Sequence, residues 1–477
     1  MKIAVVGGGL AGLTACFLLS REGLHDVVVY ERAAVHGIAA ESRRFTFGNK
    51  EINVDVPVRS INDGYYEDLT QLIRFLGGVT LDEVPTFSTH SIDSDPDKVV
   101  FSHRAFSLPF DFYVPIFHSG KLSLTFEWKR LHTRLLRDLK KGRLEGVSFG
   151  EYLQSCPCSQ EFRDHILVPM LSLMLTCPEK AALTYPADLV ASYMNRVTHG
   201  KNIRVAEGVG LLAEKLSQHC KEVRLNARIK QIIRKGGDGS DRPIHVEILH
   251  EDGAIETYDH VILATQPHHA LALLGDNASE EERRALSAFH MERSTVIMHT
   301  DTSYLPKDRR QWAAFNYVIP DRAQKGASEM PQCTVWMNKY LKGLKHEKTD
   351  LFQTWNPFLA VDESKVLSRS VFDRPVLDAT AIAGMRLLQS IQGQRSTSFC
   401  GAYALYDMPL LENAVRSSVV VARRLGATVP WKTAPLDSRL NVQVPRSLSI
   451  RKKIQQILVF PISASISLWN LMMQSLR

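Results

Sequence analysis

Three consecutive glycines between a short apolar segment and a helical pattern restrict the fold more than any other feature of this chain. Residues 2–6 (KIAVV) have the pattern of a buried strand, and residues 7–12 (GGGLAG) satisfy GxGxxG. The positions that continue with helical spacing are Leu13, Ala15, Cys16 and Leu19. In a βαβ unit, Gly7 permits the tight turn, Gly9 lets a diphosphate approach the backbone, and Gly12 lets the helix pack closely on the strand.

A second strand pattern completes this unit and ends on an acidic residue. Residues 26–31 read DVVVYE, and Glu31 lies 19 positions after Gly12. At this position a carboxylate accepts hydrogen bonds from the ribose hydroxyls of an adenine dinucleotide. The pattern therefore predicts a dinucleotide site, with a ligand-free glycine turn in an α/β fold as the alternative. It does not distinguish FAD from NAD, because both contain adenosine diphosphate.

Later segments indicate that the same domain is discontinuous. Residues 205–216 have the pattern of a glycine turn with a helix, and strand patterns follow at 222–233, 244–249 and 258–265. A late segment at 397–407 is followed by an apolar helix to Leu425. A chain of 477 residues is expected to form two domains. We predict an α/β fold with a Rossmann-like domain at 1–80, 200–275 and 385–428, an inserted α+β substrate domain at 81–199 and 276–384, and a C-terminal tail at 429–477.

Composition and charge exclude several classes of protein. With 44% hydrophobic and 23% charged residues, the chain is not a disordered or low-complexity sequence. The net charge of +7 is weak evidence for a polyanionic partner, and we expect no nucleic-acid binding. The densest basic run is residues 129–143, where Trp128, Leu131, Leu135 and Leu139 fall at helical spacing. It predicts a packed helix with a solvated outer face, with a membrane-surface or acidic-partner helix as the alternative.

The cysteines and the two ends of the chain bear on its location. Seven cysteines without a repeated spacing favour a reduced intracellular environment, and Cys156-Pro157-Cys158 lacks a second pair, so we expect no metal. Because the first strand pattern begins at residue 2, we expect no cleavable signal. Residues 457–473 are apolar but short, with Pro461 among them, and follow a basic cluster. We expect a docked or membrane-surface tail rather than a spanning helix, and hence a cytoplasmic or peripheral membrane location.

The whole chain also resembles a known family. Stretches that carry the likeness are SFGEYL (148–153), EFRDHILVPM (161–170), ILATQPHHALALL (262–274), MHTDTSYLPKDRRQWAAFNY (298–317), VWMNKYLKGL (335–344), TWNP (354–357) and FCGAY (399–403). Together with the glycine turn they resemble the FAD-dependent amine oxidase-like superfamily, which includes phytoene desaturases and protoporphyrinogen oxidases. Within it, the chain is similar to a branch of predicted flavin oxidoreductases related to the N-terminal domain of some cyclopropane fatty acid synthases.

This resemblance implies positions for cofactor and substrate. The implied FAD contacts are Gly7, Gly9, Leu10, Ala11, Gly12, Glu31, Arg32, Asp55, Val223, Thr265, Gly401, Tyr403 and Glu412. Pocket candidates that match a region between the domains of relatives are Trp312, Asn316, Tyr317, Trp336 and Asn338. No catalytic acid or base stands out. Cys400 lies where some amine oxidases attach their flavin, but its strand position favours a packed thiol.

Several positions depart from the pattern of the relatives. A second glycine after Gly37 is replaced by Ile38, and the basic residue usually found nearby is absent. The glycine of the VDxG turn is Pro57, which removes a backbone donor. In the usual HEDG tetrad, Leu411 and Ala414 replace the histidine and glycine, while Glu412 and Asn413 match the acidic pair. These changes make adenosine diphosphate binding a safer prediction than ordinary flavin chemistry.

The resemblance implies hydride transfer from a substrate carbon to flavin N5. Aromatic and aliphatic residues are frequent at 106–117 and 167–176, which suits a hydrophobic substrate, although such stripes are more often core. Two alternatives remain: a redox-neutral isomerase on the same flavin fold, and a dinucleotide-binding protein with little catalytic activity. The sequence does not predict the oligomeric state.

Overall fold

The computed structural model describes residues 1–38, 41–47, 50–85, 87–108, 112–117, 122–198, 200–236, 244–324 and 326–434. They form two compact units. The first unit contains residues 1–83, 196–291 and 375–434, and the second contains residues 84–195 and 292–374. Most of the predicted tail at 429–477 lies outside the described residues.

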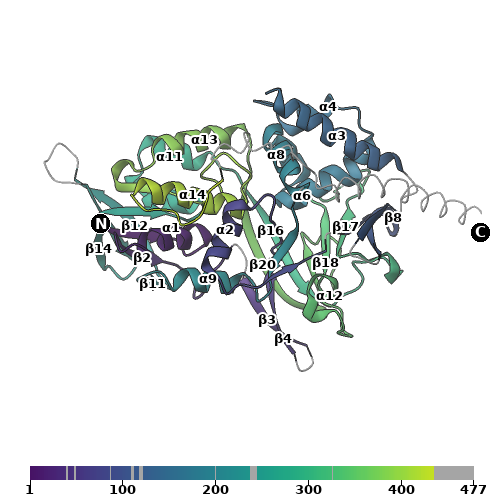
Figure 1. Ribbon diagram of the computed structural model, residues 1–477, viewed down its shortest axis with the longest axis horizontal. Coiled ribbons are helices and arrows are strands. Elements are labelled where there is room, and N and C mark those ends of the chain that lie inside the picture. The colour runs from purple at the N-terminus through teal and green to yellow at the C-terminus, as the bar shows by residue number, and fades with distance from the viewer. Residues whose placement is uncertain are drawn as a thin grey trace, which may run out of the picture. The chain divides into compact units, whose positions relative to one another are not determined.

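The first unit combines a central sheet with smaller sheets and surrounding helices (Figure 1). Its elements are β1 (Lys2–Val6), α1 (Leu10–Ser20), β2 (Asp26–Tyr30), β3 (Glu41–Phe47), β4 (Lys50–Val56), β5 (Ile61–Asn62), α2 (Glu67–Leu76), β6 (Leu81–Glu83), β10 (Asn202–Val205), α9 (Val209–Ser217), β11 (Glu222–Arg224), β12 (Ile229–Lys235), β13 (His245–His250), β14 (Ile255–Tyr258), β15 (His260–Leu263), α10 (Pro267–Leu274), α11 (Glu280–Ser287), α13 (Ala379–Ser390), β21 (Thr397–Phe399) and α14 (Leu411–Arg424).

The central sheet has five parallel strands in the order β11-β2-β1-β15-β21. Strands β1 and β2 are almost continuous apolar runs because parallel sheets are covered on both faces. Helix α1 connects these two strands and packs against α14, whereas α11 packs against α13 (Figure 1). Ten of the eleven residues of α1 are buried. The late strand β21 lies beside β15, so distant parts of the sequence complete one sheet, as predicted.

One predicted strand is wrong. The pattern at residues 222–233 was expected to form a single strand, but it forms β11 in the central sheet and β12 in an antiparallel sheet with β13 and β14. Asn226 adopts a φ of 54° between them, a conformation that asparagine tolerates better than most residues. The amides of Asn226 and Ala227 donate to the carbonyl oxygens of Ala33 and Glu31, so backbone hydrogen bonds hold the turn.

The second unit is built on an eight-stranded mixed sheet in the order β20-β16-β19-β18-β17-β7-β8-β9. Its elements, some of which cross the unit boundary by a few residues, are β7 (Ser88–Ile92), β8 (Asp95–Leu108), β9 (Phe112–Phe117), α3 (Leu122–Lys140), α4 (Phe149–Gln154), α5 (Gln160–Phe162), α6 (Val168–Leu175), α7 (Glu179–Thr184), α8 (Ala187–Thr198), β16 (Met291–His299), β17 (Phe315–Ile319), β18 (Gln332–Trp336), α12 (Met337–Tyr340), β19 (Phe352–Trp355) and β20 (Val366–Pro375). Strands β17 and β7 are parallel, and β17, β18 and β19 pair antiparallel.

The two sheets define the fold class. A parallel Rossmann-like sheet and a separate mixed sheet confirm the predicted α/β architecture. Within the described ranges, no helix combines the length and the hydrophobicity needed to cross a membrane.

Candidate cofactor site

The glycine turn between β1 and α1 is shaped by close backbone contacts. Gly7 has a φ of +113°, and a Cβ there would lie 2.8 Å from the carbonyl oxygen of Ala264. A Cβ at Gly8 would lie 2.9 Å from the Cβ of Glu31, and one at Gly12 would overlap the carbonyl oxygen of Gly7. The protein's own packing therefore requires glycine at these three positions.

Gly9 differs from its neighbours because nothing in the protein requires a glycine there. Its φ of −79° is open to any residue, and the nearest atom to an added Cβ is the carbonyl oxygen of Gly37 at 3.6 Å. Gly9 is also the N-cap of α1, where no side chain caps the helix and the first turn has no acidic residue. The space at Gly9 and the positive end of the helix dipole together suit a diphosphate. The diphosphate would occupy the space that a Cβ would fill in any other residue.

Glu31 lies directly beside this turn. Its Oε2 accepts a hydrogen bond from the Gly8 amide at 2.7 Å, and its Oε1 accepts one from the Ala33 amide at 2.8 Å. The Glu31 amide donates to the carbonyl oxygen of Arg224 on β11 at 2.8 Å. Each carboxylate oxygen can accept a second hydrogen bond, so the group can still receive ribose hydroxyls. Arg32, in contrast, is exposed.

The parallel sheet brings five of the predicted cofactor positions to one edge. Val223 lies on β11, Glu31 follows β2, Gly7 follows β1, Thr265 follows β15 and Gly401 follows β21, and we call these five positions the strand-end row. The Thr265 methyl group would lie 3.3 Å from a Cβ at Gly7. With neighbouring strands about 4.8 Å apart, the row extends about 19 Å across the sheet. Ligands of open α/β sheets bind at this carboxyl edge.

The last position of the row is followed by a buried tyrosine. Gly401 has a φ of +156°, and a Cβ there would lie 2.7 Å from the ring of Tyr403. The Tyr403 hydroxyl is buried and has no hydrogen-bond partner among the described residues, while burial raises the pKa of Tyr403. The Asn413 amide supports this loop by donating to the carbonyl oxygens of Ala402 at 2.7 Å and Leu405 at 2.8 Å. An orphaned buried hydroxyl is consistent with a bound group at this end of the row.

Two predicted cofactor residues instead stabilise helix N-termini. Asp55 is buried, and its Oδ1 accepts hydrogen bonds from Ser42 Oγ at 2.6 Å and from the Val209 amide at the start of α9 at 2.9 Å. Burial raises the pKa of Asp55. Glu412 is fully buried, and its oxygens accept from the amides of Asp68 and Leu69 at 2.8 and 3.0 Å, in the first turn of α2. These contacts explain both carboxylates without a cofactor, and their contact with FAD stays a prediction.

Sequence reasoning missed the buried charges around Glu412. Arg416 Nη1 lies 2.6 Å from Asp407 Oδ2, and Arg196 Nη1 lies 3.5 Å from the same oxygen. Asp68 accepts a hydrogen bond from Trp431 Nε1 at 3.0 Å. These residues come from three distant segments, so no local motif signals the cluster. We call Asp68, Arg196, Asp407, Glu412 and Arg416 the buried charge cluster.

The five pocket candidates lie in the second unit, where their polar groups have internal partners. The Asn316 amide bonds with the backbone of Ala313 and Thr334, and that of Asn338 with Leu344, Thr349 and Leu351. The indole nitrogens of Trp312 and Trp336 donate to Pro306 and Asp350, and the two rings pack edge to face with centroids 5.2 Å apart. Tyr317 stacks on His90 at 4.4 Å. These contacts define a packed core, and a role in substrate binding stays a prediction.

Of the positions that depart from the relatives, Ile38, Pro57 and Ala414 are buried and Leu411 is half-buried. Ile38 is 1% exposed, and the peptide bond between Val56 and Pro57 is cis. Cys400 is fully buried, and burial raises its pKa to about 12. A thiol held in its neutral form is a poor nucleophile, so the structure favours a packed thiol over a flavin attachment point.

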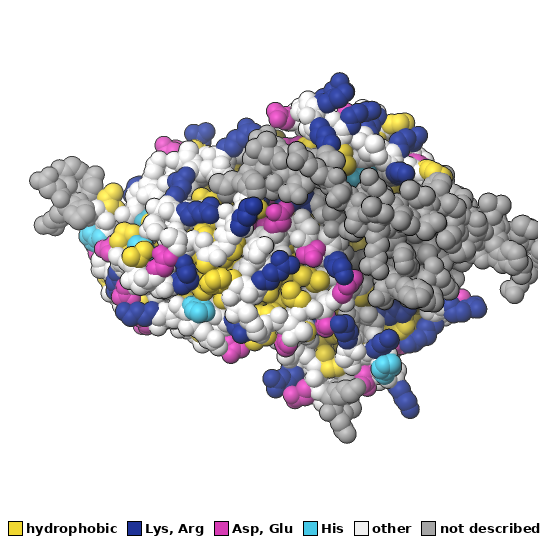
Figure 2. Space-filling model, viewed as in Figure 1, with side chains coloured by type: hydrophobic (Ala, Val, Ile, Leu, Met, Phe, Trp, Pro, Cys, Tyr) yellow, Lys and Arg dark blue, Asp and Glu magenta, His cyan; other side chains and the backbone are white. Residues whose placement is uncertain are grey.

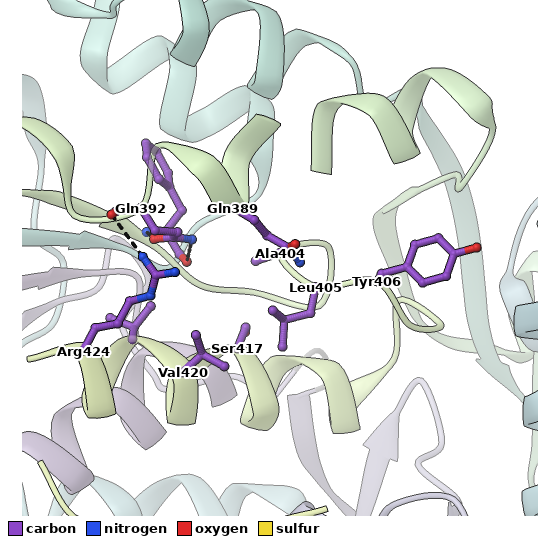
Figure 3. A pocket seen from close by; sticks show the side chains of 10 residues that line it. Gln389, Gln392, Ala404, Leu405, Tyr406, Ser417, Val420 and Arg424 are labelled. Carbon is purple, nitrogen blue, oxygen red and sulfur yellow. Dashed lines mark hydrogen bonds between the residues drawn. The ribbon is translucent and has the colours of Figure 1, made fainter. Parts of the chain in front are cut away.

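A separate cavity of about 350 Å³ lies between α13, α14 and the loop after β21 (Figure 3). Its polar groups are largely engaged inside the protein: Gln392 Nε2 donates to the carbonyl oxygen of Phe399 at 2.7 Å, and Arg424 Nη1 donates to that of Gln392 at 3.2 Å. Ser417 Oγ is bonded to the backbone of Gly401. None of the residues of the strand-end row lines it, so it is distinct from the candidate cofactor site.

Comparisons with known proteins agree with this architecture. The family model of the NAD(P)-binding Rossmann-like domain matches residues 5–76. The structure is similar to that of the CLA-producing fatty acid isomerase from P. acnes, with 16% identity, a TM-score of 0.60 and coverage of 88% of this chain and 98% of the other. No curated protein sequence matches the chain.

Two further structures are similar over the same extent. A protein assigned as a protoporphyrinogen oxidase from Exiguobacterium sp. 255-15 has 15% identity, a TM-score of 0.60 and coverage of 89% and 98%. Cyclohexylamine oxidase from Brevibacterium oxydans IH-35A has 12% identity, a TM-score of 0.60 and coverage of 89% and 99%. The chain thus contains a Rossmann-like dinucleotide-binding domain and has the fold of the flavin amine oxidases.

Proposed function

We propose that the chain is an FAD-dependent oxidoreductase. One observation carries the proposal: at the strand-end row, the uncapped N-terminus of α1 and the open space at Gly9 lie next to the turn that Glu31, the carboxylate after β2, contacts through the Gly8 amide. Similar structures that include amine oxidases support FAD over NAD. The Rossmann match at residues 5–76 alone is compatible with either.

Each part of the row has a proposed task. The first-turn amides of α1 and the space at Gly9 would bind the diphosphate, and Glu31 would hold the ribose. Thr265, Gly401 and Tyr403 would lie toward the other half of the cofactor. When bound, FAD supplies the redox chemistry by accepting a hydride from a substrate carbon. The protein's contribution is to position that carbon and to exclude water.

We propose a hydrophobic substrate. The apolar residues at 106–117 and 167–176 and the similarity to a fatty acid isomerase support this class. The same similarity favours a second candidate function, a redox-neutral isomerase that uses the same fold. The amine oxidases among the similar structures make an amine the competing substrate class.

Absorption spectroscopy of the purified protein tests the cofactor. A flavin spectrum that dithionite bleaches would support the proposal, and a colourless protein that does not take up added FAD would contradict it. Anaerobic mixing with an unsaturated fatty acid or a primary amine then tests the reaction. Lasting flavin bleaching by the substrate indicates oxidation, whereas an isomeric product without net bleaching indicates isomerisation.

Replacement of Glu31 tests the placement of the ribose. Glu31→Ala removes the charge-assisted hydrogen bonds to the cofactor, which are worth about 1.5 to 3 kcal/mol. We expect the Kd for FAD, measured by quenching of flavin fluorescence, to rise about tenfold to a hundredfold. Glu83→Ala removes an exposed carboxylate that pairs with Lys201 and should leave the Kd unchanged. An unchanged Kd in Glu31→Ala would contradict the placement.

A further inference from the structure

The net positive charge of the chain is concentrated on α3 and the residues that follow it. Residues 126–143 contain seven lysines and arginines and two acidic residues, which gives a net charge of +5, while the whole chain has +7. The remaining residues are therefore nearly neutral. This concentration is a property of one surface of the second unit.

The packing of α3 decides which side of the helix faces solvent. Leu131 and Leu135 are 3% and 0% exposed and anchor the inner face. Exposed residues recur at intervals of three or four along the other side, and they are Phe126, Lys129, Arg130, Thr133, Arg137 and Lys140. The helix is thus packed on one side and exposed on the other, which both predicted interpretations of the basic run require. Figure 2 shows Lys and Arg side chains gathered where Figure 1 places α3 and α4.

The two acidic residues of this region are turned to internal partners. Glu127 accepts hydrogen bonds from the amide and the hydroxyl of Ser159 at 2.6 and 2.9 Å. Asp138 is buried and accepts one from the Tyr152 hydroxyl at 3.0 Å, with Arg134, Arg137 and Arg143 within 3.6 Å of its oxygens. Of the seven cations in residues 126–143, Lys129, Arg130, Lys140 and Lys141 have no carboxylate partner among the described residues. Arg130 donates a hydrogen bond to the carbonyl oxygen of Pro157.

Two exposed aromatic residues lie at the beginning of the same helix. Phe126 is 50% exposed, and Trp128 remains 37% exposed although its ring packs edge to face on Phe162. Large exposed aromatic side chains are uncommon on soluble surfaces, and the described residues contain one other such phenylalanine, Phe75. Trp128 lies on the side of Leu131 and Leu135, whereas Phe126 lies on the same side as the lysines and arginines. An exposed aromatic residue beside a row of cations is typical of helices that lie at the surface of a bilayer.

We propose that the outer side of α3 binds the surface of a membrane that contains anionic lipids. Lys129, Arg130, Lys140 and Lys141 interact with the headgroups, and Phe126 enters the boundary between headgroups and acyl chains. A nucleic acid or an acidic protein would match the cations alone. Phe126, half exposed on the same side as the cations, favours lipid. Binding through this surface would place the second unit at the bilayer, where hydrophobic metabolites partition. This consequence does not depend on the assignment of FAD as the cofactor.

Vesicle flotation of the full-length protein tests the proposal. We expect binding to phosphatidylcholine vesicles that contain phosphatidylserine, little binding to phosphatidylcholine alone, and weakening by salt. Replacing Lys129, Arg130, Lys140 and Lys141 together by glutamine should weaken binding at least about tenfold. A matched variant with glutamine at Lys180, Lys201, Lys221 and Lys307, four exposed lysines elsewhere, loses the same charge and should bind like the wild type.

Phe126→Trp gives a second readout that does not depend on charge. Lipids with brominated acyl chains should quench the fluorescence that the tryptophan at this position adds, while vesicle binding persists. Equal binding of the wild type and the α3 glutamine variant would overturn the proposal. Preference for RNA or for an acidic polypeptide over phosphatidylserine vesicles would also overturn it.

Discussion

Three helices of the first unit differ in whether a carboxylate of the protein accepts hydrogen bonds from their N-terminal amides. The first-turn amides of α2 bond with Glu412, and the Val209 amide of α9 bonds with Asp55. Both carboxylates are buried and come from distant parts of the chain. Helix α1 begins at Leu10, and its N-cap Gly9 supplies no capping side chain, although almost all residues of the helix are buried. The fold thus supplies anions to two of these helices and none to the third.

The difference has a physical consequence for α1. The first four amides of a helix have no partner within the helix, and a buried end without partners is costly. Intramolecular carboxylates resolve this at α2 and α9. At α1 no side chain of the protein caps the N-terminal amides, and there is open space beside Gly9. A bound diphosphate would therefore supply the missing anion.

Removal of the α2 cap has the largest expected effect. Glu412→Ala leaves the two buried amides of Asp68 and Leu69 without their acceptor, and we expect a loss of about 4 kcal/mol in the free energy of unfolding. Urea denaturation of the cofactor-free protein measures it. Glu412→Gln keeps the shape and one acceptor and should cost about half as much. Unchanged stability with lost flavin binding would instead place Glu412 at the cofactor.

Filling the space at Gly9 should have a smaller effect, and it should weaken FAD binding rather than the stability of the fold. In Gly9→Ala the new methyl group meets no protein atom closer than 3.6 Å, so the free energy of unfolding should change by less than about 0.5 kcal/mol. The methyl group occupies the approach of the diphosphate, and the Kd for FAD should rise at least about tenfold, which is 1.4 kcal/mol. Gly12→Ala is the contrasting variant, because its Cβ would overlap Gly7 and destabilise the fold itself. Equal destabilisation by both variants would show that the space at Gly9 is not spare.

The same contrast explains what the sequence could predict. The strand, the glycine turn, α1 and Glu31 lie within the first 31 residues, and their pattern depends on neighbours in sequence. The order of parallel strands then brings Thr265 and Gly401 to the same edge. The fold class and the strand-end row therefore followed from local patterns together with the family resemblance.

Long-range contacts could not be predicted in this way. Glu412 looked like a cofactor residue because of its place in a motif, and only the position of α2 reveals its hydrogen bonds to Asp68 and Leu69. The split of residues 222–233 depends on backbone bonds from Asn226 and Ala227 to the segment after β2. In both cases the contacting residue is more than a hundred positions away in the sequence, and no periodic pattern of residues predicts such a contact.

The smallest expected effect is the pH dependence of the α2 cap. Burial, with the negative charge of nearby Asp68, raises the pKa of Glu412 to about 8, whereas an unfolded glutamate titrates near about 4.3. Between these values the folded state holds a proton that the unfolded state has released, so this contribution to stability is complete below about pH 4 and is lost as the pH rises through about 8.

Comparison of the wild type with Glu412→Gln across pH isolates this contribution, because glutamine does not titrate. The other groups that face Glu412 from the surrounding elements, Tyr65, Asp68, Arg196, Asp407 and Arg416, are present in both proteins. We expect the stability advantage of the wild type to fall by about 1 kcal/mol from about pH 6 to about pH 7 in urea denaturation. An advantage that stays constant over this range would mean that Arg196 and Arg416 keep Glu412 ionised. The α2 cap would then be a permanent charge, similar to the diphosphate expected at α1, and the cluster would carry three negative charges against two positive ones.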